Sequence, residues 1–355
     1  MIYAIAMSGG IDSSVAAALM KQKHDNVIGF TMLCYDDKVP FKLNATEKAI
    51  NDAQNICKKI NIPHYVIDLR KDFYDIVIKN FINEYKSAKT PNPCALCNQK
   101  IKFGLFYYYI IEKIKQLYNS SHDICFVSGH YAKIKCLNND YKAIFRPTDQ
   151  MKDQTYMLWA LSPEQIKRIM FPLSDYRKEE IRKIGAGFGF EISDKKDSQD
   201  ICFIDGKCND FLKHYINEEP GDIIYENEKT IGKHNGLFHF TIGQRKGLVA
   251  WSKPLYVMKL DKENNSVIVT DKLEKLYKNE FIIEQPNWQQ NDLPIISDDL
   301  TVKIRYNSSP KNIKNILSIN NKIKVILKEP TKAITPGQSA VFYKGDQLLG
   351  GGVIS

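Results

Sequence analysis

The sequence predicts an α/β domain with a mostly parallel sheet, followed by a small central β-rich domain and a C-terminal β-barrel. In the first part of the chain, apolar strands alternate with helical patterns, which is typical of parallel sheets with crossover helices. Beyond about residue 205 the helical patterns nearly vanish, and short alternating runs separated by turn residues replace them. A length of 355 residues suits two or three domains. We place them at residues 1–205, 206–272 and 273–355.

The α/β domain is justified element by element. Residues 2–6 form an apolar run that ends at a glycine turn, residues 14–23 are good helix formers, and residues 46–60 have apolar side chains at helical spacing. The expected elements are strand 2–6, helix 14–23, strand 27–34, helix 46–60, strand 64–69, helix 72–85, strand 123–128 and helices 163–170 and 177–184. Ligands of such sheets bind where the carboxyl ends of strands meet helix N-termini.

The remainder of the chain is expected to be antiparallel. Its short apolar or alternating runs predict strands at 222–225, 237–241, 255–260, 266–269, 281–283, 301–306, 322–327 and 339–343. We expect them to form one or two small domains, with a barrel at the C-terminal end.

Charge and composition narrow the class of protein. The chain carries a net charge of +9, and residues 301–344 alone hold nine Lys or Arg against Glu329. Such a block is typical of a protein that binds nucleic acid, and equally of a lysine-rich solvated surface.

No stretch of about 18 apolar residues occurs and the first residues do not resemble a signal peptide, so we expect a cytoplasmic protein with no membrane partner. In that compartment the eight cysteines do not form a disulfide framework.

The strongest motif is Ala6-Met-Ser-Gly-Gly-Ile-Asp-Ser13, between the first strand and the first helix. Gly9 and Gly10 let the backbone approach a phosphate, and the helix directs its free N–H groups at the anion. The loop lacks the lysine of common NTPase loops. It resembles the S-G-G-x-D-S loop of PP-loop ATP pyrophosphatases, which adenylate a carbonyl oxygen with ATP. The resemblance implies that Asp12 holds Mg²⁺ near the pyrophosphate.

Two further motifs carry cysteines. In Thr90–Phe103, two prolines precede Cys97, and a helix start together with Lys100 and Lys102 is expected to lower the pKa of the Cys97 thiol. Cys94-x-x-Cys97 alone fits a redox pair, a metal knuckle or chance, and no second C-x-x-C exists to complete a zinc site. In Lys196–Ile204, Cys202 follows a dense polar run, so that any pairing with Cys97 is tertiary.

Together these motifs resemble the tRNA-specific 2-thiouridylases of the MnmA type over essentially the whole chain. Segments similar to that family also stand at 128–131, 152–156, 241–248, 303–306 and 336–340. The resemblance implies ATP-dependent 2-thiolation of the wobble uridine of tRNA. Cys202 would carry a persulfide delivered by a sulfur-relay protein or a cysteine desulfurase. Cys97 would act as the nucleophile, and a Cys97–Cys202 disulfide would remain.

The same resemblance implies the binding residues. ATP would contact Ala6, Met7, Ser8, Gly9, Gly10, Ile11, Asp12, Ser13, Met32 and Gly129. The tRNA would contact Asn92, Pro93, Cys94, His130, Lys152, Asp153, Gln154, Arg305, Tyr306 and Gln338.

Cys94 departs from the family, in which many members have Asp at this position. It creates a trio with Cys97 and Cys202 that could hold a [4Fe–4S] cluster, an alternative to the persulfide route. Two other functions stay open: a different PP-loop synthetase, which would lack the paired cysteines, and a non-catalytic RNA-binding protein, which the intact glycine loop argues against. Pyrophosphate release that depends on tRNA would separate the three.

Overall fold

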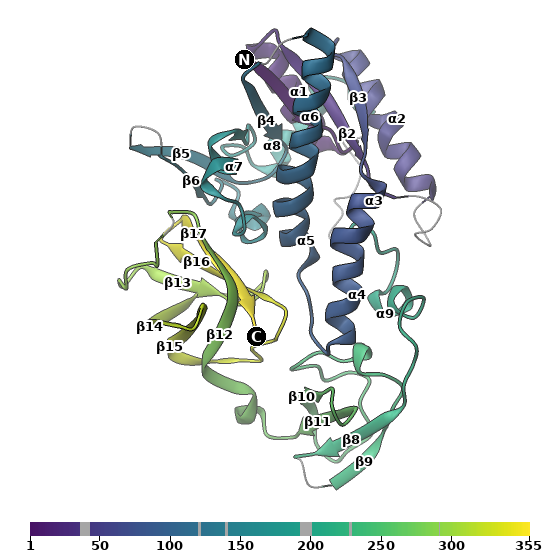
Figure 1. Ribbon diagram of the computed structural model, residues 1–355, viewed down its shortest axis with the longest axis vertical. Helices are drawn as coiled ribbons and strands as arrows, with labels where there is room; N and C mark the ends of the chain where they lie inside the picture. The colour runs from purple at the N-terminus through teal and green to yellow at the C-terminus, as the bar shows by residue number, and fades with distance from the viewer. Residues whose placement is uncertain (36–42, 120–121, 139–140, 192–200, 227–228, 291) are drawn as a thin grey trace.

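The computed structural model describes residues 1–35, 43–119, 122–138, 141–191, 201–226, 229–290 and 292–355. The N-terminal α/β domain lies at one end, a four-stranded sheet lies at the other, and the C-terminal barrel lies beside the long helices that run between them (Figure 1). Within the described residues, no helix is both long enough and apolar enough to cross a membrane.

The N-terminal sheet has five parallel strands in the order β3-β2-β1-β4-β7. Apolar side chains of its central strands are buried, which confirms the predicted parallel α/β domain. The strands are β1 (Ile2–Ala6), β2 (Val27–Leu33), β3 (His64–Asp68), β4 (Ile124–Ser128) and β7 (Ile169–Met170). The helix predicted over 163–170 is wrong at its end, because α7 (Pro163–Lys167) stops and Ile169 pairs with Phe126 at the sheet edge.

Helices cover this sheet and extend beyond it. α1 (Ile11–Lys23) begins directly after Gly10, and α2 (Leu43–Lys59) and α8 (Lys178–Gly187) match their predicted positions. The predicted helix 72–85 is a continuous segment of α3 (Arg70–Phe73), a π-helical stretch η1 (Tyr74–Ile78) and α4 (Lys79–Lys86).

The longest helical segment was predicted only at its start, near Cys97. It consists of α5 (Pro93–Leu96), the π-helical stretch η2 (Cys97–Phe106) and α6 (Tyr107–Tyr118). Asn92 caps it, since its side-chain oxygen accepts a hydrogen bond from the Ala95 amide, and Pro93 occupies the first turn, where no amide hydrogen is needed.

The C-terminal domain is a closed antiparallel barrel, as predicted. Its six strands run in the order β12-β15-β14-β13-β16-β17, and pairing of β17 with β12 closes the ring. They are β12 (Tyr277–Trp288), β13 (Leu300–Lys303), β14 (Lys311–Ile319), β15 (Lys322–Lys332), β16 (Ser339–Lys344) and β17 (Gln347–Ile354). β14 and β17 were not predicted, because the first is largely exposed and polar and the second contains three consecutive glycines.

A hairpin of the N-terminal region joins this barrel. β5 (Lys133–Asn138) and β6 (Tyr141–Phe145) pair with each other, and Phe145 of β6 pairs with Gln347 of β17. Short 3-10 turns follow the hairpin at η3 (Gln150–Lys152) and η4 (Thr155–Leu158). The hairpin therefore ties the α/β domain to the barrel through one continuous sheet.

The central domain is a four-stranded sheet in the order β10-β11-β8-β9, which matches the expectation of a small β-rich unit. Its elements are α9 (Cys208–Leu212), β8 (Gly221–Tyr225), β9 (Lys229–His234), β10 (Tyr256–Asp261), β11 (Ser266–Thr270) and the turn η7 (Leu273–Leu276).

The strand predicted over 237–241 is wrong. A 3-10 turn, η6 (Leu237–His239), stands there instead. Phe238 packs into the core of the α/β domain, whereas Phe240 packs into the core of the central sheet. Apolar residues alternate at Phe238 and Phe240 because each belongs to a different core, and not because they share one face of a strand.

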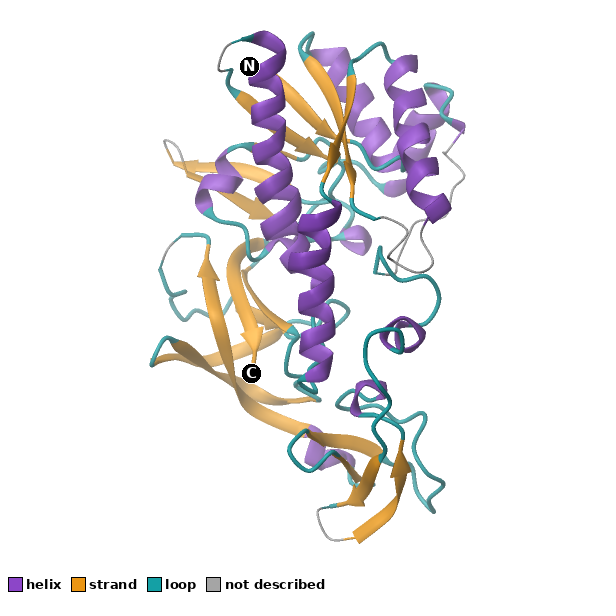
Figure 2. Cartoon of the chain, turned by 45° about the vertical axis from the view of Figure 1, so that its right-hand side comes forward, coloured by secondary structure: helices purple, strands orange, loops and turns teal. Residues whose placement is uncertain are grey.

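The start of β16 fastens the barrel to the α/β domain. In Figure 2 the orange strands around the C-terminus stand beside the long purple helices. The buried Ser339 hydroxyl accepts hydrogen bonds from Trp159 Nε1 at 3.0 Å and Asn92 Nδ2 at 3.1 Å, and its carbonyl accepts one from Tyr156 at 2.7 Å. The Gln338 amide donates to the Thr90 carbonyl at 2.8 Å. Residues 90–92, which lead into the Cys97 helix, are thus held by the barrel.

We predict that Ser339→Ala lowers the free energy of unfolding by about 1–3 kcal/mol, because the Trp159 and Asn92 donors lose their buried acceptor. Thermal unfolding followed by calorimetry measures the loss. Ser318→Ala, at an exposed position of β14, is the matched control and should change stability by no more than about 0.5 kcal/mol. Equal midpoints for the two variants would contradict the role of Ser339.

Candidate active site

A cavity of about 210 Å³ opens at the carboxyl end of the parallel sheet. Seven of the ten residues predicted to contact ATP line it: Ala6, Met7, Ser8, Asp12, Ser13, Met32 and Gly129. Other lining residues come from the long helix and from the segment after β4, among them Lys102, Phe103, Phe106, His130 and Gln154. Ile11 faces the protein core instead, where it is 4% exposed.

The glycine loop packs too closely for larger residues. Gly9 has φ +70°, and a Cβ atom there would lie 2.5 Å from the Ala49 carbonyl oxygen. A Cβ on Gly129 would lie 2.8 Å from the Ser13 amide nitrogen and from the Asp12 carbonyl carbon. Such distances cannot be accommodated without moving backbone, so Gly9 lets the loop approach α2 and Gly129 lets the end of β4 approach the start of α1.

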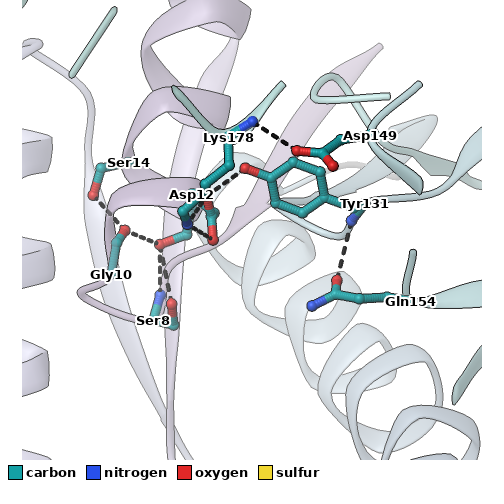
Figure 3. Close-up of polar contacts among 9 residues, drawn as sticks. Ser8, Gly10, Asp12, Ser14, Tyr131, Asp149, Gln154 and Lys178 are labelled. Carbon is teal, nitrogen blue, oxygen red and sulfur yellow. Dashed lines mark hydrogen bonds and ion pairs between the residues drawn. The ribbon is translucent and has the colours of Figure 1, made fainter. Parts of the chain in front are cut away.

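Hydrogen bonds among residues 8–14 hold the glycine loop in a compact turn (Figure 3). The Ser8 amide donates to Ser13 Oγ at 3.1 Å, and the Ser13 and Ser14 hydroxyls both donate to the Gly10 carbonyl at 3.0 Å. Gly10 is the N-cap of α1. The loop therefore sits at the positive end of this helix, the position that suits an anion such as phosphate.

Asp12 forms an ion pair with a lysine that the sequence analysis did not predict. The Lys178 ammonium donates to both carboxylate oxygens of Asp12, at 2.7 and 2.8 Å, and the Tyr131 hydroxyl donates to Oδ1 at 2.9 Å (Figure 3). Lys178 begins α8, is 8% exposed, and its amide donates to Asp149 at 2.9 Å. The pair brings together residues 166 positions apart, so no local pattern could have signalled it.

The magnesium contact predicted for Asp12 stays a prediction. In this structure the Lys178 ammonium lies on both carboxylate oxygens of Asp12. No group of three or more His, Cys, Asp or Glu side chains within the described residues is arranged to hold a metal ion. Lys178 therefore supplies a positive charge beside Asp12.

Cysteines from three separate segments meet next to the cavity. Cys34 follows β2, Cys94 and Cys97 lie on the long helix, and Cys202 lies 105 positions beyond Cys97. Residues 196–200 of the motif before Cys202 lie outside the described residues. A charge on Cys202 raises the pKa of the Cys94 and Cys97 thiols, which places the three within electrostatic reach of one another. All the cysteines are free thiols.

The predicted low pKa of Cys97 is wrong. Burial raises the pKa of this thiol to about 12, and the nearby Lys102 ammonium opposes that shift only in part. Cys97 is 6% exposed, and its amide is already bonded within the helix, so it is not at an open helix N-terminus. The thiol is therefore held in its neutral form.

The cysteines differ in access. Cys202 is exposed, Cys94 is half-buried, and Cys97 and Cys34 are buried. A macromolecule at the surface can thus reach Cys202 but not Cys97. Among the described residues, Cys94, Cys97 and Cys202 are not grouped closely enough to count as a metal-ligand set, and the [4Fe–4S] alternative stays a prediction.

The residues predicted to contact tRNA fall into two sets, and several of them hold the protein together. Near the thiols, Pro93 is buried, and Asn92 and Gln338 join the α/β domain to the barrel. His130 lies beside the nucleotide cavity, bonded to Ser128 at 2.8 Å, and burial holds its pKa well below the ordinary value. Gln154 accepts a hydrogen bond from the Tyr131 amide at 3.0 Å.

The second set lies where the loop 152–154 meets the barrel. The Tyr306 hydroxyl donates to the Asp153 carbonyl at 3.0 Å, and Lys152 precedes this contact. Arg305 Nη2 donates to Thr335 Oγ1 and to the carbonyls of Ala333 and Ile242, the last in the central domain. This face is therefore built from all three parts of the chain.

The basic block of residues 301–344 is partly neutralised by acids outside it. Three of its lysines form ion pairs: Lys322–Glu284, Lys324–Glu280 and Lys328–Asp298. Arg305, Lys311 and Lys332 line a hollow of about 440 Å³ on the barrel. Three cations of the block therefore lie together at this hollow.

The fold and site define an α/β nucleotide-binding domain whose cavity adjoins a group of thiols. Three domain families match the chain: the tRNA methyl transferase HUP domain over residues 1–206, the tRNA methyl transferase PRC-barrel domain over 209–271, and the aminomethyltransferase beta-barrel domain over 278–354.

Proteins similar over their full length give a more particular identification. The tRNA-specific 2-thiouridylase MnmA of Halothermothrix orenii is 40% identical over 99% of this chain and 98% of that protein. The protein of the same name from Aquifex aeolicus is 37% identical over 100% of this chain and 99% of its own length. The chain belongs to the tRNA-specific 2-thiouridylase family, which confirms the resemblance that its motifs indicated.

Solved structures match only weakly. A 4-thiouridine synthetase–RNA complex with bound ATP aligns with a TM-score of 0.33 and 18% identity over 55% of this chain and 42% of that chain. The U34-tRNA thiolase NcsA from Methanococcus maripaludis aligns with a TM-score of 0.34 and 16% identity, over 60% of this chain and 63% of that chain.

We predict that iodoacetamide at pH 7.5 alkylates the exposed Cys202 well before Cys97, because a thiol with a pKa of about 12 holds almost no thiolate at that pH. Alkylation of Cys97 should rise about tenfold per pH unit up to pH 11. Peptide mapping by mass spectrometry measures both sites. Cys57, whose pKa burial also raises to about 12, is the internal control, and faster labelling of Cys97 than Cys202 would contradict the assignment.

Proposed function

We propose that this chain uses ATP to adenylate the C2 oxygen of the wobble uridine of a tRNA, and replaces that oxygen with sulfur from a cysteine persulfide. Family membership supports tRNA 2-thiolation as the activity. One structural observation carries the proposal. The helical stretch η2 begins with Cys97 and supplies Lys102, Phe103 and Phe106 to the nucleotide cavity, so that one rigid element spans both halves of the reaction.

Adenylation is needed because a C2 carbonyl is a poor electrophile until its oxygen becomes a leaving group. The C2 oxygen attacks the α-phosphorus of ATP, an O–P bond forms, the bond to the β-phosphate breaks, and pyrophosphate leaves as the N3 proton is lost to solvent. The glycine loop at the start of α1 suits the phosphates, and the Lys178 ammonium provides positive charge at the same place.

Sulfur transfer then uses the two cysteines. A sulfur-relay protein or a cysteine desulfurase loads the exposed Cys202 with a sulfane sulfur. The Cys97 thiol loses its proton to solvent, the resulting thiolate attacks Cys202 Sγ, a disulfide forms, and the outer sulfur leaves as hydrosulfide. Hydrosulfide adds to C2, AMP departs with its bonding electrons, and the sulfur-bound proton passes to N3. A thiol reductant restores both cysteines. Burial supports this order, because it keeps Cys97 neutral until its proton is removed.

The tRNA is proposed to lie across the face where the loop 152–154 meets the barrel. Arg305 and Tyr306, together with the cations that line the hollow on the barrel, suit a phosphate backbone. On this proposal residues 1–205 form the catalytic domain and residues 273–355 hold the tRNA, with residues 206–272 between them. The target base must leave its stack to reach the thiols, as for other enzymes that act on a base.

We predict that Gly129→Ala weakens ATP binding more than tenfold, because the added methyl would force apart the backbones of Gly129, Asp12 and Ser13. Isothermal titration calorimetry with ATP measures the effect. Gly187→Ala on α8 is the matched control, since no atom lies within 4 Å of its Cβ position, and it should bind ATP normally. Unchanged affinity in Gly129→Ala would place the nucleotide elsewhere.

We predict that Cys97→Ser and Cys202→Ser each abolish 2-thiouridine formation, because a serine hydroxyl neither carries sulfane sulfur nor forms the disulfide. Cys94→Asp should retain activity, since it restores the residue common in the family. The assay follows AMP release and thiouridine in a tRNA transcript with ATP and a persulfide donor.

Cys136→Ser, at an exposed cysteine of β5, is the control and should be fully active. Loss of activity in Cys94→Asp together with loss of bound iron from an anaerobically purified enzyme would favour the cluster route. AMP release that does not require tRNA would point to a different PP-loop synthetase.

A further inference from the structure

A tyrosine that the proposed mechanism does not use contacts the sulfur of Cys202. The Tyr35 hydroxyl donates a hydrogen bond to Cys202 Sγ at 2.8 Å, across 167 positions of sequence. We propose that Tyr35 is a positioning residue that holds the Cys202 sulfur as an anion ready to accept sulfane sulfur. The role of this hydrogen bond in sulfur loading rests on the proposed function. The hydrogen bond itself and its effect on the Cys202 sulfur do not depend on that function.

Both partners of this bond are held by one aromatic cluster. The Tyr35 ring meets Phe73 edge-on at 5.3 Å, and Phe73 in turn packs edge-on against Phe203, the residue after Cys202, at 5.9 Å. Phe203 is 1% exposed and also packs against Phe81 and Phe211. Tyr35, which follows β2, and Cys202, which precedes Phe203, are therefore both held by the same aromatic core. The core fixes the position of the hydroxyl relative to the sulfur.

Tyr35 is suited to donate. Burial raises the pKa of its hydroxyl well above the ordinary value, and the charges of Cys202, Cys34 and Cys97 raise it further. The hydroxyl therefore keeps its proton throughout the neutral and mildly alkaline range. The protonated hydroxyl is therefore able to donate to Cys202 Sγ at the 2.8 Å that separates the two atoms.

The chemistry that needs this contact is loading. The Cys202 thiolate attacks the outer sulfur of a donor persulfide R–S–SH, a new S–S bond forms, the donor S–S bond breaks, and R–S⁻ carries away the electron pair. Only the anion attacks, and Cys202 is the exposed member of the group, so it is the sulfur that a donor protein can reach. A hydroxyl that donates to the anion raises the fraction of reactive enzyme.

A second tyrosine–cysteine pair provides a natural comparison. Cys208 and Tyr85 lie 3.6 Å apart, and there the thiol donates to the tyrosine oxygen. This contact is longer than the 2.8 Å contact between Tyr35 and Cys202. Because Tyr85 contacts Cys208 rather than Cys202, removing its hydroxyl leaves the Tyr35–Cys202 contact in place.

The test compares the rate of iodoacetamide alkylation of Cys202 in the full-length wild type and in Tyr35→Phe, which keeps the ring and removes only the hydroxyl. We expect the rate at pH 7 to fall about fivefold, the size of one hydrogen bond. At pH 10, where cysteine thiols are largely ionised without help, the difference should shrink below twofold. A loss of packing alone would slow alkylation equally at both pH values.

Tyr85→Phe is the matched control and should leave the Cys202 rate unchanged at either pH. Equal rates for wild type and Tyr35→Phe at pH 7, or a difference that persists at pH 10, would overturn the proposal. Thiouridine formation by the wild type is measured in parallel. If the wild type makes no thiouridine but the alkylation difference is present, the proposed function fails while the role of Tyr35 on the sulfur stands.

Discussion

The position of Cys97 depends on hydrogen bonds made by another domain. The helix that carries this cysteine begins at Pro93, and the segment that leads into it is tied to Gln338 and Ser339 at the start of β16. A cap at Asn92 then sets the direction of the helix. The barrel is therefore more than a surface for a partner: it is the support against which the thiols and the nucleotide cavity are aligned, and a change in its seating would displace the helix that joins them.

The site also shows how burial decides the charge of its groups. Lys178 and Asp12 form an ion pair within hydrogen-bond distance, so that each offsets the charge of the other. The Cys97 thiol and the His130 ring have no such compensation, and burial drives both toward their neutral forms. The glycine loop thus carries an ion pair, whereas the Cys97 thiol stays uncharged until a reactant changes its surroundings. An anionic ligand and a neutral nucleophile can accordingly lie a short distance apart.

Much of this arrangement could be predicted from the sequence, and the failures have identifiable causes. The glycine loop was found because its function is local, with strand, turn and helix adjacent along the chain. Lys178 was missed because its partner lies 166 positions away and nothing in α8 marks it. The pKa of Cys97 was predicted with the wrong sign because the lysines nearby are visible in sequence and burial is not. The false strand at 237–241 arose where Phe238 and Phe240 serve two different cores.

The π-helical geometry of η2 makes the site sensitive to the number of residues between Cys97 and Lys102. A π-helix closes its hydrogen bonds over one more residue per turn than an α-helix, and residues 97–106 sustain that pattern. If the stretch relaxed at the same length to ordinary α-helical geometry, which is intrinsically the more favourable, the thiol would rotate by about 100° relative to the residues that face the cavity. In this segment the backbone geometry of lower energy would misalign the reactive groups. The number of residues between Cys97 and Lys102 therefore matters to the site as much as the identity of these two residues.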